Sequence, residues 1–328
     1  MSMHSTVTQR DKVEIAEAAL RPGTSIRRPR RLTPGLIISA IIVCIVLAVF
    51  TEAVITAPVM AWGVVWDNLF SSLVLTGVLH TVELTVVCEG LAIVSAAILA
   101  WMLVSGNIVW RFVAHGYQWF FRSIPELAQL IFWFNLSLLF PTLGVGIPFG
   151  GATFGQVPTN QIITPWLAAV VGIGLHEGAY LAEVFRAGVN SVSVGQREAA
   201  RALGLTPRRV FRRIVLPQAM WVIVPNAGSR LIGTLKLTSL ASVLAISELL
   251  YTVENIFSRT LQTIPLLLVA TAWYMAMVGL LRLLQWLLER HYAAAAHRGE
   301  RAPRAGGRRR ARAARANQKI ELAEVAGA

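Results

Sequence analysis

Long apolar runs separated by short polar segments dominate the pattern of this chain. A membrane-spanning helix needs roughly 20 predominantly apolar residues. The fifth apolar run contains Pro225, Gly228 and Gly233, which permit kinked or broken helices inside a membrane bundle. The pattern therefore predicts an all-α integral membrane protein with six spans, the fifth of them irregular. The six runs lie at residues 36–50, 70–104, 124–140, 162–185, 214–246 and 264–288.

The first apolar run has the length of either a membrane anchor or the core of a secretory signal peptide. The basic segment that precedes it, residues 1–34, is unusually long for a signal peptide. No small-x-small cleavage site follows the apolar run. We therefore interpret residues 35–55 as an uncleaved transmembrane helix. Residues 1–34 mix charged residues, Pro and Ser without a sustained apolar period, which predicts a disordered N-terminal arm.

Composition agrees with a membrane protein, and charge placement predicts its orientation. Hydrophobic residues make up 55% of the 328-residue chain and charged residues only 14%, against about one-quarter charged residues in soluble domains. The net charge of +13 is concentrated: seven Lys or Arg precede residue 36, seven lie within 186–213 and eleven follow residue 281. The positive-inside rule places these segments in the cytoplasm. Six crossings then put both termini on the cytoplasmic side.

The Arg- and Ala-rich tail, residues 293–328, predicts a disordered cytoplasmic segment that follows a transmembrane domain at residues 68–292. Its arginines suit anionic lipid headgroups, at about 1 kcal/mol per cation near a membrane surface. RNA binding is disfavoured because no aromatic side chain interleaves the arginines to stack on bases.

One polar segment between the fourth and fifth runs has the pattern of two short helices. Residues 196–203 contain three alanines of high helix propensity, and Gly204 suits the C-terminal cap. Thr206 and Pro207 then provide an N-cap and a first helical residue for the second helix. The small alanine side chains let another protein approach the first helix closely, and Glu198 is expected to stabilise the positive end of its dipole.

This arginine-rich segment permits two functional interpretations. One is a membrane-anchored nucleic-acid-binding regulator that uses residues 197–213 as a helix-turn-helix. A DNA-reading domain needs further helices to complete its core, whereas both flanks here enter apolar runs almost at once. The other is docking to a cytoplasmic protein, which we favour, so we expect no nucleic-acid partner.

The same segment resembles a motif of ATP-binding cassette importer permeases. The sequence EAARALGLTPRRVFRRIVLP, residues 198–217, is similar to their EAA loop, which has Gly four residues after the second Ala and a hydrophobic-x-Leu-Pro end. In that family the first short helix inserts into a cleft of the ATPase subunit, which implies a coupling loop at residues 195–217. The ATPase-coupling residues implied by the resemblance are Gln196, Glu198, Ala199, Ala200, Leu203, Gly204 and Pro217.

Further blocks resemble the polar amino acid permeases of the histidine, glutamine and arginine type. FRSIPELAQL is similar to their Arg-Gly-Thr-Pro-Leu-Leu-x-Gln segment, and EGAYLAEVFRAGVN is similar to their Ala-Tyr-x-x-Glu-x-x-Arg element. The blocks span about residues 70–290 and imply a five-span permease core with one extra N-terminal transmembrane helix, in the bacterial cytoplasmic membrane. Ser123, Ile124 and Glu126 depart from the pattern, which leaves the substrate class open.

The resemblance also implies partners and excludes catalysis on this chain. It implies a cytoplasmic ATPase dimer, a second permease copy or paralogue, and an extracytoplasmic amino-acid-binding protein. The chain has no Gly-x-x-x-x-Gly-Lys-Ser/Thr loop, nucleophile elbow or paired zinc motif. We therefore expect no catalytic residue, metal or cofactor here, with ATP and Mg bound by the ATPase.

Several charged residues lie inside the apolar runs, where each costs at least about 2.5 kcal/mol on insertion scales. Such groups usually face a protein interior or a water-filled route. Carboxylates on a route for an amino acid would meet its ammonium group, while a lysine or hydroxyl would meet its carboxylate. The candidate pathway residues are Glu83, Glu126, Glu177, Glu183, Lys236 and Ser239, and His176 and Arg230 belong to the same set of buried polar groups.

The alternative is that these side chains form structural pairs between helices. For Glu183 and Lys236, which match ordinary positions of the family, we favour a structural or gating role because polar bonds between helices are common in membranes. For Glu83, Glu126 and Glu177 both interpretations stay open.

Overall fold

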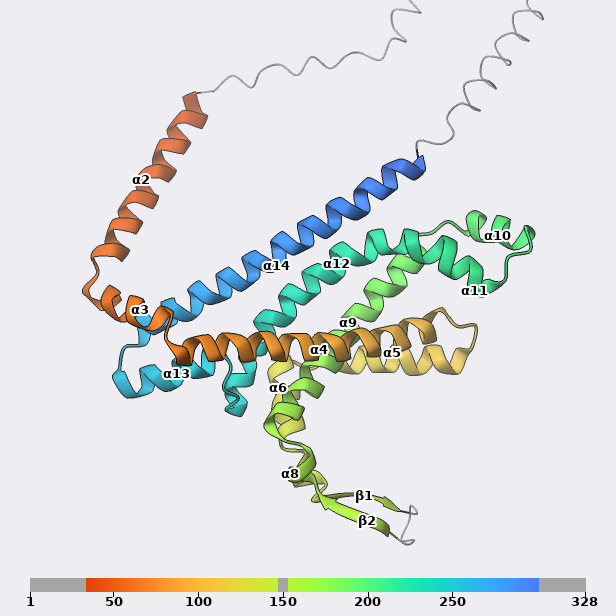
Figure 1. Cartoon of the computed structure of the whole chain (residues 1–328), viewed down its shortest axis with the longest axis horizontal. Helices are drawn as coiled ribbons and strands as arrows, with labels where there is room; N and C mark the ends of the chain where they lie inside the picture. Colours follow the sequence, from red (N-terminus) through yellow and green to blue (C-terminus); the bar gives the residue numbers. More distant parts are fainter. Residues whose placement is uncertain (1–33, 147–152, 301–328) are drawn as a thin grey trace, which may run out of the picture. The chain divides into compact units, whose positions relative to one another are not determined.

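The structure is a computed structural model, almost entirely helical, that describes residues 34–146 and 153–300 (Figure 1). The predicted arm up to residue 33 and residues 301–328 of the predicted tail lie outside the described residues. The chain divides into two compact units, one up to Met60 and one from Ala61 onward.

The first unit consists of one long helix and a single turn. Helix α2 covers Pro34–Thr56, and the 3-10 turn η1 covers Pro58–Met60. The large apolar side chains of α2 from Ile37 to Phe50 are exposed. A helix that is apolar on nearly all sides suits lipid surroundings. The first apolar run thus forms a helix long enough to span a membrane.

Helix α9 is at the centre of the second unit. It covers Pro165–Asn190 and packs against α4, Ser72–Val104, and α12, Leu216–Leu237. Small residues permit the close approach: a Cβ added at Gly174 would lie 2.8 Å from Leu91 Cδ2 of α4. Membrane helices commonly use small residues in this way because packing drives their association.

The remaining helices of the second unit surround these three. The elements are α3 Trp62–Leu69, α5 Ile108–Ser123, α13 Leu249–Thr260 and α14 Thr263–Glu300. Trp273 of α14, the last of these helices, donates its indole N–H to the carbonyl oxygen of Leu69 in α3 at 2.7 Å. This bond joins the first and last helices of the unit.

The third apolar run does not form the single spanning helix that its hydropathy predicts. It is divided into α6, Glu126–Phe134, and α7, Leu136–Leu139. At the break, Asn135 donates its side-chain amide to the Ile131 carbonyl oxygen at 2.8 Å, and such bonds compete with the helical ladder. The helix is therefore much shorter than the roughly 20 residues that a span needs.

A hairpin that the apolar pattern did not predict follows α7. Strands β1, Thr142–Gly146, and β2, Thr153–Pro158, pair antiparallel with Thr142 opposite Pro158. The short helix α8, Thr159–Ile162, returns the chain to α9. In Figure 1 the hairpin projects away from the helices.

The irregularity predicted for the fifth run lies beyond the residues that suggested it. Helix α12 continues through Pro225, Gly228 and Gly233. The chain turns only after the 3-10 segment η3, Thr238–Leu244, where Ala245 has a left-handed φ of 57°. In the described chain four helices, α2, α4, α9 and α14, are long and apolar enough to span a membrane, and the bent pair at 207–244 and 249–260 is a fifth candidate.

The last helix extends past the predicted start of the tail at residue 293. Helix α14 ends at Glu300. Alanine has the highest intrinsic helix propensity of any residue type. The run Ala293–Ala296 therefore continues the helix that the apolar residues begin.

Candidate functional site

The first helix of the polar loop begins earlier than its alanines suggest. Helix α10 covers Val194–Ala202, and the Ser193 hydroxyl accepts the Gln196 N–H at 3.3 Å as its N-cap. Glu198 therefore lies beyond the first turn. A helix terminus acts on charges only within its first or last turn, so the predicted dipole role of Glu198 is wrong.

The turn after α10 is a Schellman motif. Gly204 has a φ of +76° and donates its N–H to the Arg201 carbonyl oxygen at 2.9 Å. Leu205 donates its N–H to the Ala200 carbonyl oxygen at 3.2 Å. These are the two bonds that define the motif. The predicted glycine cap is confirmed, and it depends on the positive φ, because a Cβ at Gly204 would meet nothing within 4 Å.

The second helix of the loop is the beginning of a spanning helix. Helix α11, Pro207–Val210, starts with Thr206 at the N-cap and Pro207 in the first position, although the Thr206 side chain makes no capping bond. It passes through the π-helical turn η2, Phe211–Val215, into α12. No independent helix-turn-helix domain is formed by residues 197–213, because the second helix has no end of its own.

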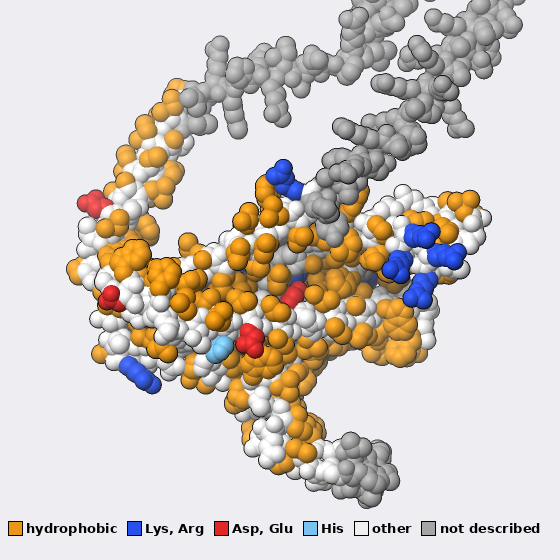
Figure 2. Space-filling view, in the orientation of Figure 1, with side chains coloured by type: hydrophobic (Ala, Val, Ile, Leu, Met, Phe, Trp, Pro, Cys, Tyr) orange, Lys and Arg blue, Asp and Glu red, His pale blue; other side chains and the backbone are white. Residues whose placement is uncertain are grey.

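The loop has an anchored interior and an exposed outer surface. Ala200 is 4% exposed and packs with Val192, Val210 and Val215, so its small side chain serves internal packing. Leu203, by contrast, is 83% exposed. Figure 2 shows basic side chains gathered at this end of the molecule, over α10 and α11. The other predicted coupling residues are all exposed: Gln196, Glu198, Ala199, Gly204 and Pro217.

A buried ion pair joins α9 to α12. Arg230 donates to both oxygens of Glu177, from Nε at 2.9 Å and from Nη2 at 2.7 Å. Glu177 is 4% exposed. The Arg230 guanidinium also lies 4.3 Å from the ring centre of Tyr180, and that of Arg122 lies 4.8 Å from the same ring. Two guanidinium groups thus stack on one aromatic ring, with the carboxylate of Glu177 bound to one of them.

A histidine connects this pair to the start of α6. His176 Nε2 lies 3.2 Å from Glu126 Oε1. The amide Nε2 of Gln129 lies 3.2 Å from His176 Nδ1 and donates to the carbonyl oxygens of Phe121 and Ile124. The two N–H hydrogens of the Gln129 amide are thus taken by the two carbonyl oxygens.

Glu89 is a buried member of the same region that the sequence analysis missed. It is 8% exposed on α4, and its Oε2 accepts the Thr234 hydroxyl at 2.8 Å. Thr234 also donates to the Arg230 carbonyl oxygen at 3.1 Å. The available signal was the buried stripe Thr81, Thr85 and Glu89, which are spaced four residues apart within an apolar run.

The structure brings together only part of the predicted pathway set. Glu126 and Glu177 lie on either side of His176 and Tyr180, whereas Glu183 pairs with Arg186 on its own helix, Nε to Oε2 at 3.0 Å. Among the described residues no ion pair or hydrogen bond links the others to this cluster. Glu83 and Lys236 are exposed, and Ser239 donates to the Lys236 carbonyl oxygen.

These residues form a polar cluster between helices. Bidentate arginines suit carboxylates, and the carboxylates of Glu126 and Glu177 suit an ammonium or guanidinium group. Within residues 34–146 and 153–300 there is no group of three or more His, Cys, Asp or Glu side chains that could hold a metal ion.

Comparison with known proteins identifies the relatives of this chain. Residues 91–293 match the family described as binding-protein-dependent transport system inner membrane component. The chain is 36% identical over 279 residues to the arginine transport system permease protein ArgU of Corynebacterium glutamicum, covering 83% of this chain and 86% of that protein. It is 28% identical to the histidine/lysine/arginine/ornithine transport system permease protein HisQ of Escherichia coli, covering 70% and 98%.

Solved structures agree with these sequence relatives. A crystal structure of an amino acid ABC transporter with histidines is matched at a TM-score of 0.57 and 28% identity, over 67% of this chain and 94% of that chain. The inward-facing MetNI methionine ABC transporter is matched at a TM-score of 0.53 and 19% identity, which shows the fold alone. The nucleic-acid regulator interpretation is not supported, because the matched family region contains residues 197–213.

Proposed function

Because this chain belongs to the binding-protein-dependent transport system inner membrane component family, we propose that it carries a polar amino acid across the cytoplasmic membrane, coupled to a separate ATPase through α10. It is a permease subunit of an amino acid ABC importer and a multi-pass membrane protein. We propose, in addition, which amino acids it carries, which residues couple it to the ATPase, and which side of the membrane its loop and termini face.

The continuity of α11, η2 and α12 carries the coupling proposal. Helix α10 exposes Leu203 and Glu198 to a partner and is held to the rest of the loop by buried Ala200. A force applied to α10 therefore reaches α12 through the short turn at 203–206 and through the packing of Ala200 against Val210 and Val215. The coupling set is Gln196, Glu198, Ala199, Leu203, Gly204 and Pro217 as exposed residues, with Ala200 as their anchor.

The proposed assembly follows from the family. Two ATPase subunits bind ATP and Mg, a second permease copy or paralogue completes the membrane part, and an extracytoplasmic binding protein delivers the amino acid. The basic loop at 197–213 is cytoplasmic in this arrangement, and so are both termini.

We propose that the substrate route passes the Tyr180 cluster, defined as Arg122, Glu126, His176, Glu177, Tyr180 and Arg230. Glu126 has a partly exposed carboxylate, which is available to a cationic group of a substrate. Glu177 is occupied by Arg230, so its role is gating. Glu83, Glu183, Lys236 and Ser239 stay candidates outside the cluster. Arginine is the first substrate to test, since a 36% identical relative is named an arginine permease.

The coupling proposal is tested with a matched pair of glycine substitutions. Gly204→Ala forces a side chain into a left-handed φ, which costs roughly 1 kcal/mol or more. We expect it to lower uptake per ATP hydrolysed, or ATPase binding, in proteoliposomes. The control is Gly195→Ala in α10, whose added Cβ would come no closer than 3.9 Å to a neighbouring atom, Ser193 Oγ. We expect it to keep both uptake per ATP hydrolysed and ATPase binding.

A second substitution addresses the partner-facing surface directly. Glu198→Ala removes an exposed carboxylate without altering the turn. We expect weaker co-purification of the ATPase or hydrolysis uncoupled from uptake. Normal association and normal uptake in both Gly204→Ala and Glu198→Ala would refute the assignment of α10 as the coupling helix.

A further inference from the structure

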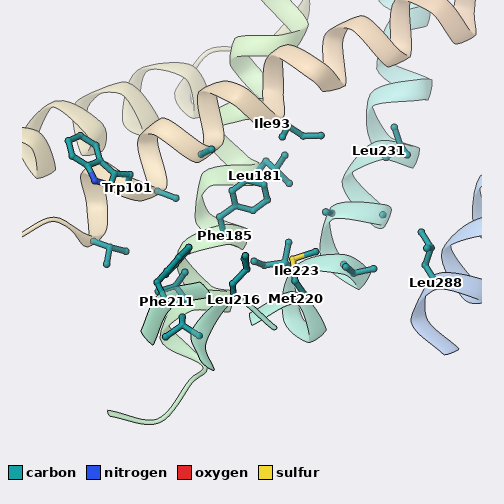
Figure 3. Close-up of a pocket in the computed structure, with 18 of the residues that line it drawn as sticks. Ile93, Trp101, Leu181, Phe185, Phe211, Leu216, Met220, Ile223, Leu231 and Leu288 are labelled. Atoms are coloured by element: carbon teal, nitrogen blue, oxygen red, sulfur yellow. The ribbon is translucent and has the colours of Figure 1, made fainter. Parts of the chain in front are cut away.

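A large open cavity lies between α4, α9, α12 and α14 of the second unit and extends to the loop (Figure 3). Its volume is about 990 Å³. Trp101, Phe185, Met220 and Leu288 line it, one from each of these helices. Trp101 and Leu288 are also exposed at the surface, at 62% and 52%. The wall is therefore apolar and open toward the surroundings of the helices.

The cavity carries positive charge at its loop end. Arg197 and Arg201 of α10 line the cavity, as does Ser105 at the end of α4. Arg197 donates from Nη2 to the Val192 carbonyl oxygen at 2.9 Å, but its buried Nε has no hydrogen-bond partner among the described residues. A guanidinium carries five N–H donors, and the bond to Val192 uses one of them, so Arg197 keeps further donors for an acceptor in the cavity.

Among the described residues that line the cavity, the only cations are Arg197 and Arg201. Glu89 also lines the cavity and already accepts the Thr234 hydroxyl. From Glu89 to Ser105 the lining follows α4, a distance of about 24 Å at 1.5 Å per residue. One leaflet with its headgroup region is roughly 20–22 Å thick. The apolar wall thus has about the length of one leaflet.

We propose that this cavity binds one anionic phospholipid, with its phosphate at Arg197 and Arg201 and its acyl chains along the apolar wall. Guanidinium groups bind phosphate oxygens through paired, charge-assisted hydrogen bonds. Basic pockets between membrane helices on the cytoplasmic side are suited to anionic headgroups. The proposal rests on the proposed function only in assigning the arginine end to the cytoplasmic leaflet.

The charge distribution favours a lipid over the other occupants. A second permease copy's apolar helix would fill the apolar wall but would leave the charges of Arg197 and Arg201 without an anionic partner. A free amino acid or inorganic phosphate would meet the arginines but leave the long apolar wall exposed. A phospholipid satisfies both ends with one molecule.

The test uses the permease purified with its ATPase, delipidated in detergent, and follows thermal unfolding of the permease. Phosphatidylglycerol is compared with phosphatidylcholine of the same acyl chains and with inorganic phosphate. We expect phosphatidylglycerol to raise the melting temperature by roughly 2–4 °C more than either of the others. The double variant R197Q/R201Q should lose this difference, whereas R208Q/R209Q, with the same charge removed from exposed arginines outside the cavity, should keep it.

A second variant keeps the test decisive if the double variant fails to fold. Ala97→Trp fills the cavity, and Ile98→Trp adds the same ring to an exposed neighbour outside it. Native mass spectrometry should find phosphatidylglycerol retained by Ile98→Trp and lost from Ala97→Trp. Equal stabilisation by the three additives, or retention by Ala97→Trp, overturns the proposal.

The competing occupant is addressed with a cysteine at the rim of the cavity. Disulfide formation between two copies of Val104→Cys, a residue that lines the cavity, would assign the cavity to a permease contact and overturn the lipid proposal. Uptake is not measured in any of these experiments. Failure of the lipid site and failure of ATP coupling are therefore separately visible.

Discussion

Glu177 and Arg230 are the residues whose contact joins the two helices most relevant to transport. The carboxylate is buried on α9, and the guanidinium reaches it from α12 while stacking on Tyr180. Such a pair adds little net stability compared with apolar packing, but the loss of one partner leaves a buried charge unpaired.

Substitution of one member of this pair should be costly. Glu177→Gln is expected to lower the free energy of unfolding in detergent by roughly 3 kcal/mol, because the Arg230 charge loses its carboxylate. Glu183→Gln, which removes a half-exposed carboxylate paired within α9, should cost no more than about 1 kcal/mol. Thermal or denaturant unfolding measures both.

The double variant tests the reason given for that loss. Glu177→Gln with Arg230→Met removes both charges and should recover part of the stability lost in Glu177→Gln. A double variant less stable than Glu177→Gln would show that the pair stabilises by itself rather than by avoiding an unpaired charge.

Helix packing in the second unit depends on glycines of α9. A Cβ added at Gly188 would lie 2.4 Å from Ile223 Cγ1 and 3.1 Å from the Ala219 carbonyl oxygen of α12. Backbone atoms cannot move aside as a side chain can. The distance between α9 and α12 is therefore set by the absence of a side chain at this position.

Gly188→Ala should push these helices apart. We expect a loss of about 1–3 kcal/mol in the free energy of unfolding, typical of overpacking, and lower uptake. Gly90→Ala in α4 is the control, because its Cβ would meet nothing within 4 Å and alanine has the higher helix propensity. If both variants behaved alike in a thermal unfolding assay, the close approach of α9 and α12 would not be what the glycine provides.

The elements that the sequence predicts well are those with a local cause. Hydropathy identifies α4, α9 and α14 because each carries a long apolar run, and Gly204 identifies the turn because only its backbone conformation is needed there. The break at Asn135 depends on one side chain bonding to its own helix, which hydropathy does not register. Glu89 was missed because its partner, Thr234, is distant in sequence.

For the whole molecule, the apolar core is confined to the second unit. All four clusters of buried apolar residues lie between Val65 and Met277, and α2 contributes to none of them. The fold of the permease core should therefore not require the first unit.

A shortened chain tests this independence. Residues 61–328, expressed with the ATPase, should unfold within a few degrees of the full chain in the same detergent, because no core contact is removed. The melting temperature from thermal unfolding is the measurement. A large drop would show that α2 stabilises the core despite its absence from the clusters.

The helical segment from Pro207 to Leu244 begins in the loop and continues into the bundle. A tilt about its loop end therefore displaces the residues that lie far along it. Arg230 lies about 35 Å along it from Pro207 at 1.5 Å per residue. A tilt of about 5° at the loop end displaces Arg230 by about 3 Å over that length, enough to take a 2.7 Å bond beyond hydrogen-bonding distance. If α10 couples to an ATPase as proposed, a rotation of a few degrees imposed there would open the Glu177 ion pair.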